Sequence, residues 1–178
     1  MTALCLTFAK LYRSTLQGLQ YLNQLALGKN RFSGTLCGSA LARLTQLKEI
    51  FLNDNFLSGA IAPEIGYLTS LTRLFLHKNL FQSPIPSFDS LPALEDFTLS
   101  DNLLQGLVPT TFLAKAKSSL KTLILHNNEE MEFDTPLLQE FTMLQYADLQ
   151  VPSLPLLSDT LLLHHNACIA SLLSLQSV

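Results

Sequence analysis

The sequence is poor in the residues that hold together small secreted frameworks and metal sites. It has no tryptophan, and its three cysteines, Cys5, Cys37 and Cys168, are far apart and odd in number. No Cys-x-x-Cys pair occurs, so we expect neither a disulfide framework nor a structural zinc site. No Asn-x-Ser/Thr sequence occurs either, which argues against a heavily glycosylated ectodomain.

The chain is also short of charge and of uninterrupted apolar runs. Charged residues make up 14% of it, and the net charge is −3, with acidic and basic residues intermixed. The lack of a basic stripe argues against nucleic acid as a partner. No stretch of about 20 residues is free of polar breaks, so we expect no membrane span in this chain. The first ten residues lack the basic start of a signal peptide, and we interpret them as part of the fold.

Leucine, by contrast, is abundant and accounts for 42 of the 178 residues. This density is typical of coiled coils, membrane spans and leucine-rich solenoids. Heptads are absent, and proline and glycine interrupt the apolar runs. The length and the apolar fraction of 48% suit one domain with a substantial core. We therefore expect a single domain over residues 1–178.

The stretch 47–71 contains a pattern that recurs along the chain. It reads Leu-x-x-Ile-x-Leu-x-x-Asn-x-Leu-Ser-Gly-x-Ile and then reaches a proline. Related copies occupy residues 22–36, 71–86, 94–109 and, for the first half only, 120–128. The steps between the repeated asparagines are 25, 24, 23 and 26 residues; these are Asn30, Asn55, Asn79, Asn102 and Asn128. A period of this length predicts a solenoid.

Each part of the pattern has a physical interpretation. An alternating pair such as Leu74 and Leu76 predicts a short strand with both side chains in the core. The glycine and proline that follow, such as Gly59 and Pro63, favour turns and 3₁₀ segments over long helices. The asparagine is expected to satisfy backbone groups at a buried corner between neighbouring turns. We therefore interpret the asparagine row as structural.

The pattern weakens at both ends of the chain. We expect a degenerate repeat or cap at residues 3–21, regular repeats at 22–128, and degenerate repeats with a C-terminal cap at 129–178. The acidic run at 129–134 lacks the glycine and proline of the pattern, and we expect a solvated loop there on the convex side. Residues 144–149 retain the strand pattern, and residues 161–166 restore a strand and an asparagine.

With the repeat written out, the chain resembles the plant-type leucine-rich-repeat family, whose unit reads Leu-x-x-Leu-x-Leu-x-x-Asn-x-Leu-Ser-Gly-x-Ile-Pro-x-x-Leu. Residues 47–71 match this unit apart from Ala62, which is inserted before Pro63, and Ser83 replaces the glycine in another copy. The resemblance covers residues 16–128.

The resemblance implies both a fold and a kind of function. The implied fold is α/β: a right-handed, horseshoe-shaped solenoid with a parallel β-sheet on its concave face. Short helices, 3₁₀ turns or irregular structure would form the convex side. The family implies binding of proteins or peptides, as in the ectodomains of receptor-like proteins and receptor-like kinases. The chain would be a short member of this family or a fragment of a longer one.

Function in a solenoid is expected at positions that the core does not use. The position between the paired apolar residues of each strand should face solvent on the concave sheet, and it is occupied by Ala26, Phe51, Phe75, Thr98, Ile124 and Asp148. Neighbouring turns stack about 4.8 Å apart, so we expect Phe51 and Phe75 side by side, as in a binding hot spot. The candidate partner-binding residues are Phe51, Phe75, Ile124, Arg73, Glu49, Asp96, His77 and Tyr146.

A catalytic or metal site is the weaker alternative. His77 and His126, with Ser100 and Asp101 between them, would lie two turns or about 10 Å apart, too far for a direct hydrogen bond. No Gly-x-Ser-x-Gly, phosphate loop or His-Glu-x-x-His occurs. We therefore expect a protein that is not an enzyme and that has no cofactor and no metal ion.

The sequence thus predicts a non-catalytic module that binds a protein or peptide partner on its concave face. Two alternatives stay open: a fragment of a receptor-like ectodomain that acts in signalling, and a structural spacer without a dedicated site. A cytoplasmic location is favoured for the chain as given, and a cell-surface location for a receptor fragment.

Overall fold

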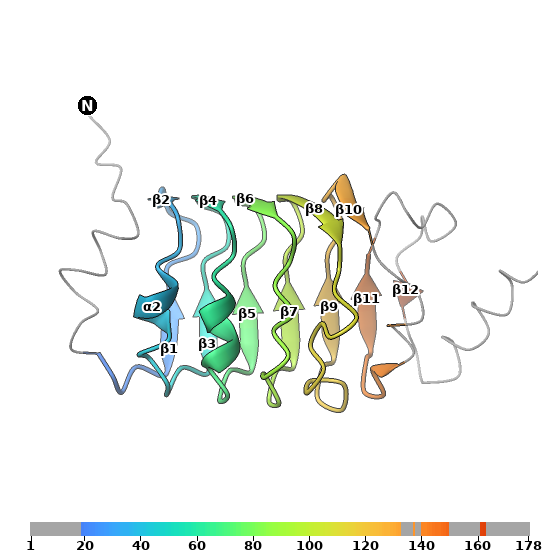
Figure 1. The fold of residues 1–178 in the computed structure, drawn as a ribbon. Helices are drawn as coiled ribbons and strands as arrows, with labels where there is room; N and C mark the ends of the chain where they lie inside the picture. Colours follow the sequence, from blue (N-terminus) through green and yellow to red (C-terminus); the bar gives the residue numbers. More distant parts are fainter. Residues whose placement is uncertain (1–18, 133–136, 138–139, 150–160, 163–178) are drawn as a thin grey trace, which may run out of the picture.

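The computed structural model describes residues 19–132, 137, 140–149 and 161–162, which form a solenoid of stacked turns (Figure 1). Each turn contributes one short strand to a sheet whose neighbours from β1 to β11 are parallel. These strands are β1 (Gln24–Ala26), β3 (Glu49–Phe51), β5 (Arg73–Phe75), β7 (Asp96–Thr98), β9 (Thr122–Ile124) and β11 (Tyr146–Asp148). The predicted solenoid with a parallel sheet is confirmed, and we call the outer side of this sheet the concave face.

A second parallel sheet lies where the chain leaves the first one, along the upper margin of Figure 1. Its order is β10-β8-β6-β4-β2, and its strands are β2 (Ser33–Gly34), β4 (Phe56–Gly59), β6 (Leu80–Ser83), β8 (Leu103–Leu107) and β10 (Glu130–Glu132). The sequence predicts only turns here, because serine and glycine are poor strand formers. The sheet forms because successive turns place equivalent segments side by side.

The return segments carry little helix among the described residues. A four-residue helix, α2 (Gly38–Leu41), and a 3₁₀ helix, η2 (Pro63–Tyr67), occupy the first two returns. Pro63 starts η2, where its missing N–H costs nothing. This agrees with the expected short-helix, 3₁₀ and irregular convex side. In the part of the chain that the structure describes, no helix has the length and apolarity needed to cross a bilayer.

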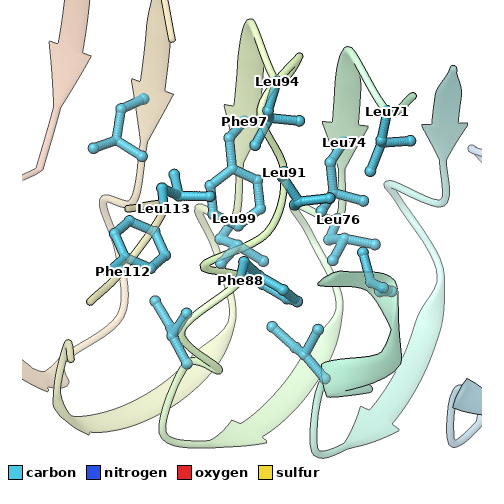
Figure 2. Packing of buried hydrophobic residues seen from close by; sticks show 14 of the residues in the cluster. Leu71, Leu74, Leu76, Phe88, Leu91, Leu94, Phe97, Leu99, Phe112 and Leu113 are labelled. Carbon is cyan, nitrogen blue, oxygen red and sulfur yellow. The ribbon is translucent and has the colours of Figure 1, made fainter. Parts of the chain in front are cut away.

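The core fills the space between the first sheet and the return segments (Figure 2). Its central column runs through the middle of each strand and is buried throughout, as Leu25, Ile50, Leu74, Phe97, Leu123 and Ala147. Phe97 packs against Phe88 and Phe112 on the return segments, with ring centroids 5.9 and 5.8 Å apart. Leu27, predicted to lie in the core, is only partly buried at its edge.

The asparagine ladder forms as predicted and ties each turn to the preceding one. Asn79 Nδ2 donates to the carbonyls of Leu76 and His77 in its own turn and to Leu52 in the preceding turn, at 3.0 to 3.3 Å. Its Oδ1 accepts the backbone N–H of Leu57 at 3.0 Å. The same four-bond pattern recurs at Asn55, Asn102 and Asn128. The side chain of exposed Asn30 bonds only within its own turn.

The expectation of a solvated loop in the acidic run is wrong for residues 130–132. They form β10, which pairs in parallel with β8 and extends the second sheet. Met131 is 1% exposed and points inward, whereas Glu130 and Glu132 point to solvent. The alternation Glu-Met-Glu is the strand signal that the run of charge conceals.

The C-terminal expectations are only partly within the described residues. The strand pattern at residues 144–149 is confirmed as β11. The strand expected near residue 161 is present as β12 (Leu161–Leu162), but it pairs antiparallel with β11, so it does not continue the parallel stack. The expected N-terminal repeat at residues 3–21 lies almost entirely outside the described residues, as does most of the expected cap.

We expect Asn79→Ala to lower the free energy of unfolding by about 1–3 kcal/mol, because it leaves several buried backbone groups without partners. Asn30→Ala is the matched control and should cost less than about 1 kcal/mol, because Asn30 is exposed and its side chain bonds only within its own turn. Urea unfolding followed by circular dichroism measures both. Equal losses would show that the bonds between turns contribute nothing.

Ser83 occupies a left-handed position that the other regular turns give to glycine. Its φ is 81°, and Gly34, Gly59 and Gly106 have φ of 87°, 75° and 79°. A residue with a Cβ is destabilised by about 1–2 kcal/mol in this left-handed conformation. Glycine avoids this strain but loses more conformational entropy on folding, which offsets part of the gain. We expect Ser83→Gly to stabilise the fold by about 0.5–1 kcal/mol in the same assay.

Gly59→Ala serves as the opposite control. A Cβ at this position would lie 2.8 Å from Thr35 Cγ2, so the variant should be destabilised. A Ser83→Gly variant less stable than the wild-type chain would contradict the strain argument.

Candidate functional site

The candidate site is centred on two phenylalanines that the parallel register places side by side. Phe51 is the register partner of Phe75, and their ring centroids are 5.0 Å apart at an interplanar angle of 53°. The ring of His77 follows at 6.1 Å from that of Phe75. All three side chains are partly exposed on the concave face. The predicted adjacency is therefore present, together with an imidazole that extends the ring surface.

An ion network borders the aromatic pair at the start of the strands. Arg73 lies between two carboxylates: its Nη1 is 3.1 Å from Glu49 Oε1, and its Nε is 3.4 Å from Asp96 Oδ2. Gln24 donates a hydrogen bond to the same Glu49 carboxylate. Such exposed pairs contribute little to stability, but they fix the orientation of the guanidinium beside the rings.

The other candidate residues lie farther along the same sheet. Ile124 on β9 is partly exposed and pairs in register with Thr98 and Asp148. Tyr146 on β11 is partly exposed beside Thr122. They are two and three strands beyond Phe75, so the structure does not bring them into contact with the phenylalanine pair. They belong to the same face as a more distant extension.

The expectation that this column faces solvent is wrong for Thr98 and Asp148, which are only 7% and 8% exposed. Histidines of the neighbouring turns cover them. His77 Nδ1 lies 2.8 Å from Thr98 Oγ1, and His126 Nδ1 lies 2.9 Å from Asp148 Oδ2. The larger histidine side chains, two positions further along the preceding turn, therefore close over the smaller ones.

His77 is held in its neutral form by its surroundings. Burial lowers the pKa of His77 from its usual 6.5, and the positive charge of Lys78 acts in the same direction. The carboxylate of Asp54, 4.0 Å from Nε2, opposes this effect on the pKa without overcoming it. The surface formed by Phe51, Phe75 and His77 is therefore uncharged at neutral pH.

A second polar cluster, outside the predicted partner-binding residues, lies at the C-terminal half of the face. His126 is flanked by two carboxylates, with Nε2 at 3.8 Å from Asp101 and Nδ1 at 2.9 Å from Asp148. Asn127 donates a hydrogen bond to Asp101 at 2.7 Å. Aligning the repeats places His126 and Asp148 on adjacent turns, two positions apart. This diagonal relation between neighbouring strands was the feature of the sequence that indicated their contact.

The two histidines belong to separate clusters, as the sequence predicts. His77 contacts Thr98 and approaches Asp54, whereas His126 lies between Asp101 and Asp148. Within the described ranges, no three histidine, cysteine or carboxylate side chains gather in a way that would hold a metal ion.

Comparisons with known proteins agree with the fold and the repeat. No family model matches the chain. Receptor-like kinase TMK4 of Arabidopsis thaliana is 39% identical over 87 residues, which cover 48% of this chain and 9% of the relative. Receptor protein kinase WSS1 of Oryza sativa subsp. japonica is 34% identical over 75 residues, or 42% of this chain and 8% of the relative. The chain thus matches less than a tenth of the length of either relative.

Solved structures extend the similarity over most of the chain. The leucine-rich-repeat ectodomain of the receptor kinase GASSHO1/SCHENGEN3 from Arabidopsis thaliana has a TM-score of 0.66 and 30% identity, covering 74% of this chain and 16% of that one. The ectodomain of the Arabidopsis receptor kinase HAESA has a TM-score of 0.63 and 27% identity, covering 75% and 24%. Repeat, fold and relatives agree: the chain folds as a leucine-rich-repeat solenoid that is similar to parts of plant receptor ectodomains.

Proposed function

We propose that this chain is a non-catalytic module that binds a protein or peptide partner on its concave face, with Phe51 and Phe75 as the apolar centre of the site. The observation that carries the proposal is the contact of these two rings, 5.0 Å apart, on a sheet face where they remain partly exposed. The buried column of the same strands already supplies the core, so the fold does not require aromatic residues here.

The surroundings of the two rings have the arrangement of a binding surface. Aromatic side chains contribute large apolar area at low entropic cost, and charged groups at the rim set orientation and specificity. Glu49, Arg73 and Asp96 form such a rim at one side of the rings, and His77 adds an uncharged polar group at the other. Ile124 and Tyr146 would contact a partner that extends along the sheet.

Solved structures with the same fold support a peptide as the partner. The GASSHO1/SCHENGEN3 ectodomain is described in complex with CASPARIAN STRIP INTEGRITY FACTOR 2, and the HAESA ectodomain in complex with a peptide hormone. These ligands belong to those proteins. For this chain they support a partner of the same general class.

The two alternatives from the sequence have unequal support. The relatives are receptor kinases and receptor-like proteins, which favours a segment of a cell-surface receptor over a cytoplasmic protein. Nothing in the relatives supports the cytoplasmic location favoured from the sequence. A structural spacer would need a featureless polar concave face, and the phenylalanine pair argues against it.

The test of the site is a double substitution, Phe51→Ala with Phe75→Ala. Twelve-residue peptides would be selected from a random library on the wild-type chain, and their affinities compared by biolayer interferometry. We expect the double variant to weaken binding about thirtyfold or more, because truncating a hot spot costs about 2 kcal/mol or more.

Phe56→Ala is the matched control, since Phe56 is 54% exposed but lies on the second sheet. It should leave the affinity unchanged. Unaltered binding by a folded Phe51→Ala/Phe75→Ala chain would reject the proposed site.

We also expect binding to weaken as the pH falls below about 6.5. A partner that covers the rings would bury His77 further, and a buried imidazolium is costly. The lowered pKa of His77 keeps this group neutral at pH 7.5, where affinity should be greatest. Titrating the selected peptides between pH 7.5 and 5 should give a smaller loss for His77→Gln than for the wild-type chain. Equal losses would remove His77 from the site.

A further inference from the structure

The C-terminal half of the concave face carries carboxylates that no lysine or arginine neutralises within the described residues. At the other half, Arg73 lies between Glu49 and Asp96, and Lys78 Nζ reaches Asp54 at 4.0 Å. Farther along the face, His126 lies between the carboxylates of Asp101 and Asp148, and Asn127 donates a hydrogen bond to Asp101.

The charge of this second cluster is negative whichever form His126 takes. Two carboxylates around a neutral imidazole carry two negative charges, and protonation of the imidazole leaves one. Lys48 and the Lys121–Glu95 pair lie at the opposite ends of the strands, before the sheet begins. They do not reach Asp101 or Asp148.

Asp148 is the strongest indication that this cluster is incomplete. It is 8% exposed, yet its Oδ1 has no hydrogen-bond partner among the described residues. His126 Nδ1 approaches Oδ2 to 2.9 Å, but without the geometry of a hydrogen bond. A buried carboxylate oxygen without a partner is costly and is uncommon in native proteins. A positive charge placed over this cluster would offset that cost, and the partly exposed Asp101 gives access to it.

The acidic cluster adjoins a cleft with the same chemistry. Asn127, which bonds to Asp101, also lines a hollow of about 470 Å³ between the last turns of the second sheet. Glu129 and Glu130 line this cleft, together with glutamine side chains and Leu103. The negative region therefore continues from the concave face around the edge of the solenoid.

The register fixes how far this cluster lies from the aromatic pair. Asp101 follows β7, His126 follows β9 and Asp148 lies on β11, which are one, two and three strands beyond β5 with Phe75. At about 4.8 Å per strand, the separation across the sheet is about 5 to 14 Å. An extended peptide advances about 3.3 Å per residue, so about two to four residues would bridge the two clusters.

We propose that the partner is an extended peptide segment with an apolar side chain on Phe51 and Phe75 and a lysine or arginine side chain about two to four residues away, bound over Asp101, His126 and Asp148. This inference rests on the proposed function, because it assigns the ligand class to the same face. It adds a cation-binding subsite to the apolar one.

The experiment uses synthetic twelve-residue peptides built from glycine, serine and alanine. Each carries one leucine or phenylalanine and one lysine, arginine or glutamine, placed two to seven residues away in either direction. Binding to the purified full chain is measured by biolayer interferometry at fixed ionic strength. We expect lysine or arginine about two to four residues from the apolar residue to bind about fivefold or more tightly than glutamine, and longer spacings to show less preference.

Substitutions then locate the effect. Asp101→Asn and the double variant Asp101→Asn/Asp148→Asn should remove the preference for the cationic peptide over the glutamine peptide. Asp89→Asn is the matched control: it removes an exposed carboxylate on a return segment outside both sheets and should keep the preference. Asp101→Asn alone tests the subsite even where the double variant does not fold.

Three outcomes would overturn the proposal. The first is equal affinity for lysine and glutamine peptides at every spacing, and the second is a preference that Asp89→Asn reduces as much as Asp101→Asn does. The third is a wild-type chain that binds none of the peptides. In the first two cases, weakened binding by Phe51→Ala/Phe75→Ala would leave the proposed function standing. Unweakened binding by that variant would reject the proposed function itself.

Discussion

The side-chain hydrogen bonds of the buried asparagines join each turn of this solenoid to the preceding one. A strand that ends abruptly inside a solenoid exposes backbone groups at a buried corner, and each such group would be costly without a partner. A primary amide both donates and accepts, so Asn79 satisfies carbonyls in two turns and an N–H in the preceding turn at once. Because the bonds cross between turns, they also set the register.

Everything on the concave face follows from that register. With the turns locked in step, equivalent positions form columns, and Phe51 and Phe75 become neighbours although 24 residues separate them. The core column of the same strands is completely committed to packing. Side chains that face outward are therefore not needed for core packing, and their chemistry is available for binding.

The two ends of the face differ in how their charges are balanced. Near the phenylalanine pair, Arg73 is held between two carboxylates, and burial keeps the pKa of His77 low. Farther along, Asp101 and Asp148 surround a single histidine. Arginine and lysine side chains thus accompany the carboxylates of one half of the face, whereas only a histidine lies between those of the other. That asymmetry gives an extended partner a direction as well as a position.

The repeat alone determined the solenoid, the asparagine ladder and the adjacency of Phe51 and Phe75, because a fixed period maps sequence offset directly onto spatial neighbourhood. The alternation of charged and apolar residues around Met131 also indicated a strand, but the charge of the surrounding residues favoured the prediction of a loop. Tertiary structure decided the second sheet, because its pairing arises between turns and not from local strand propensity. It also decided the burial of Thr98 and Asp148, since this depends on how the histidines of adjacent turns lie across them, which no single repeat specifies.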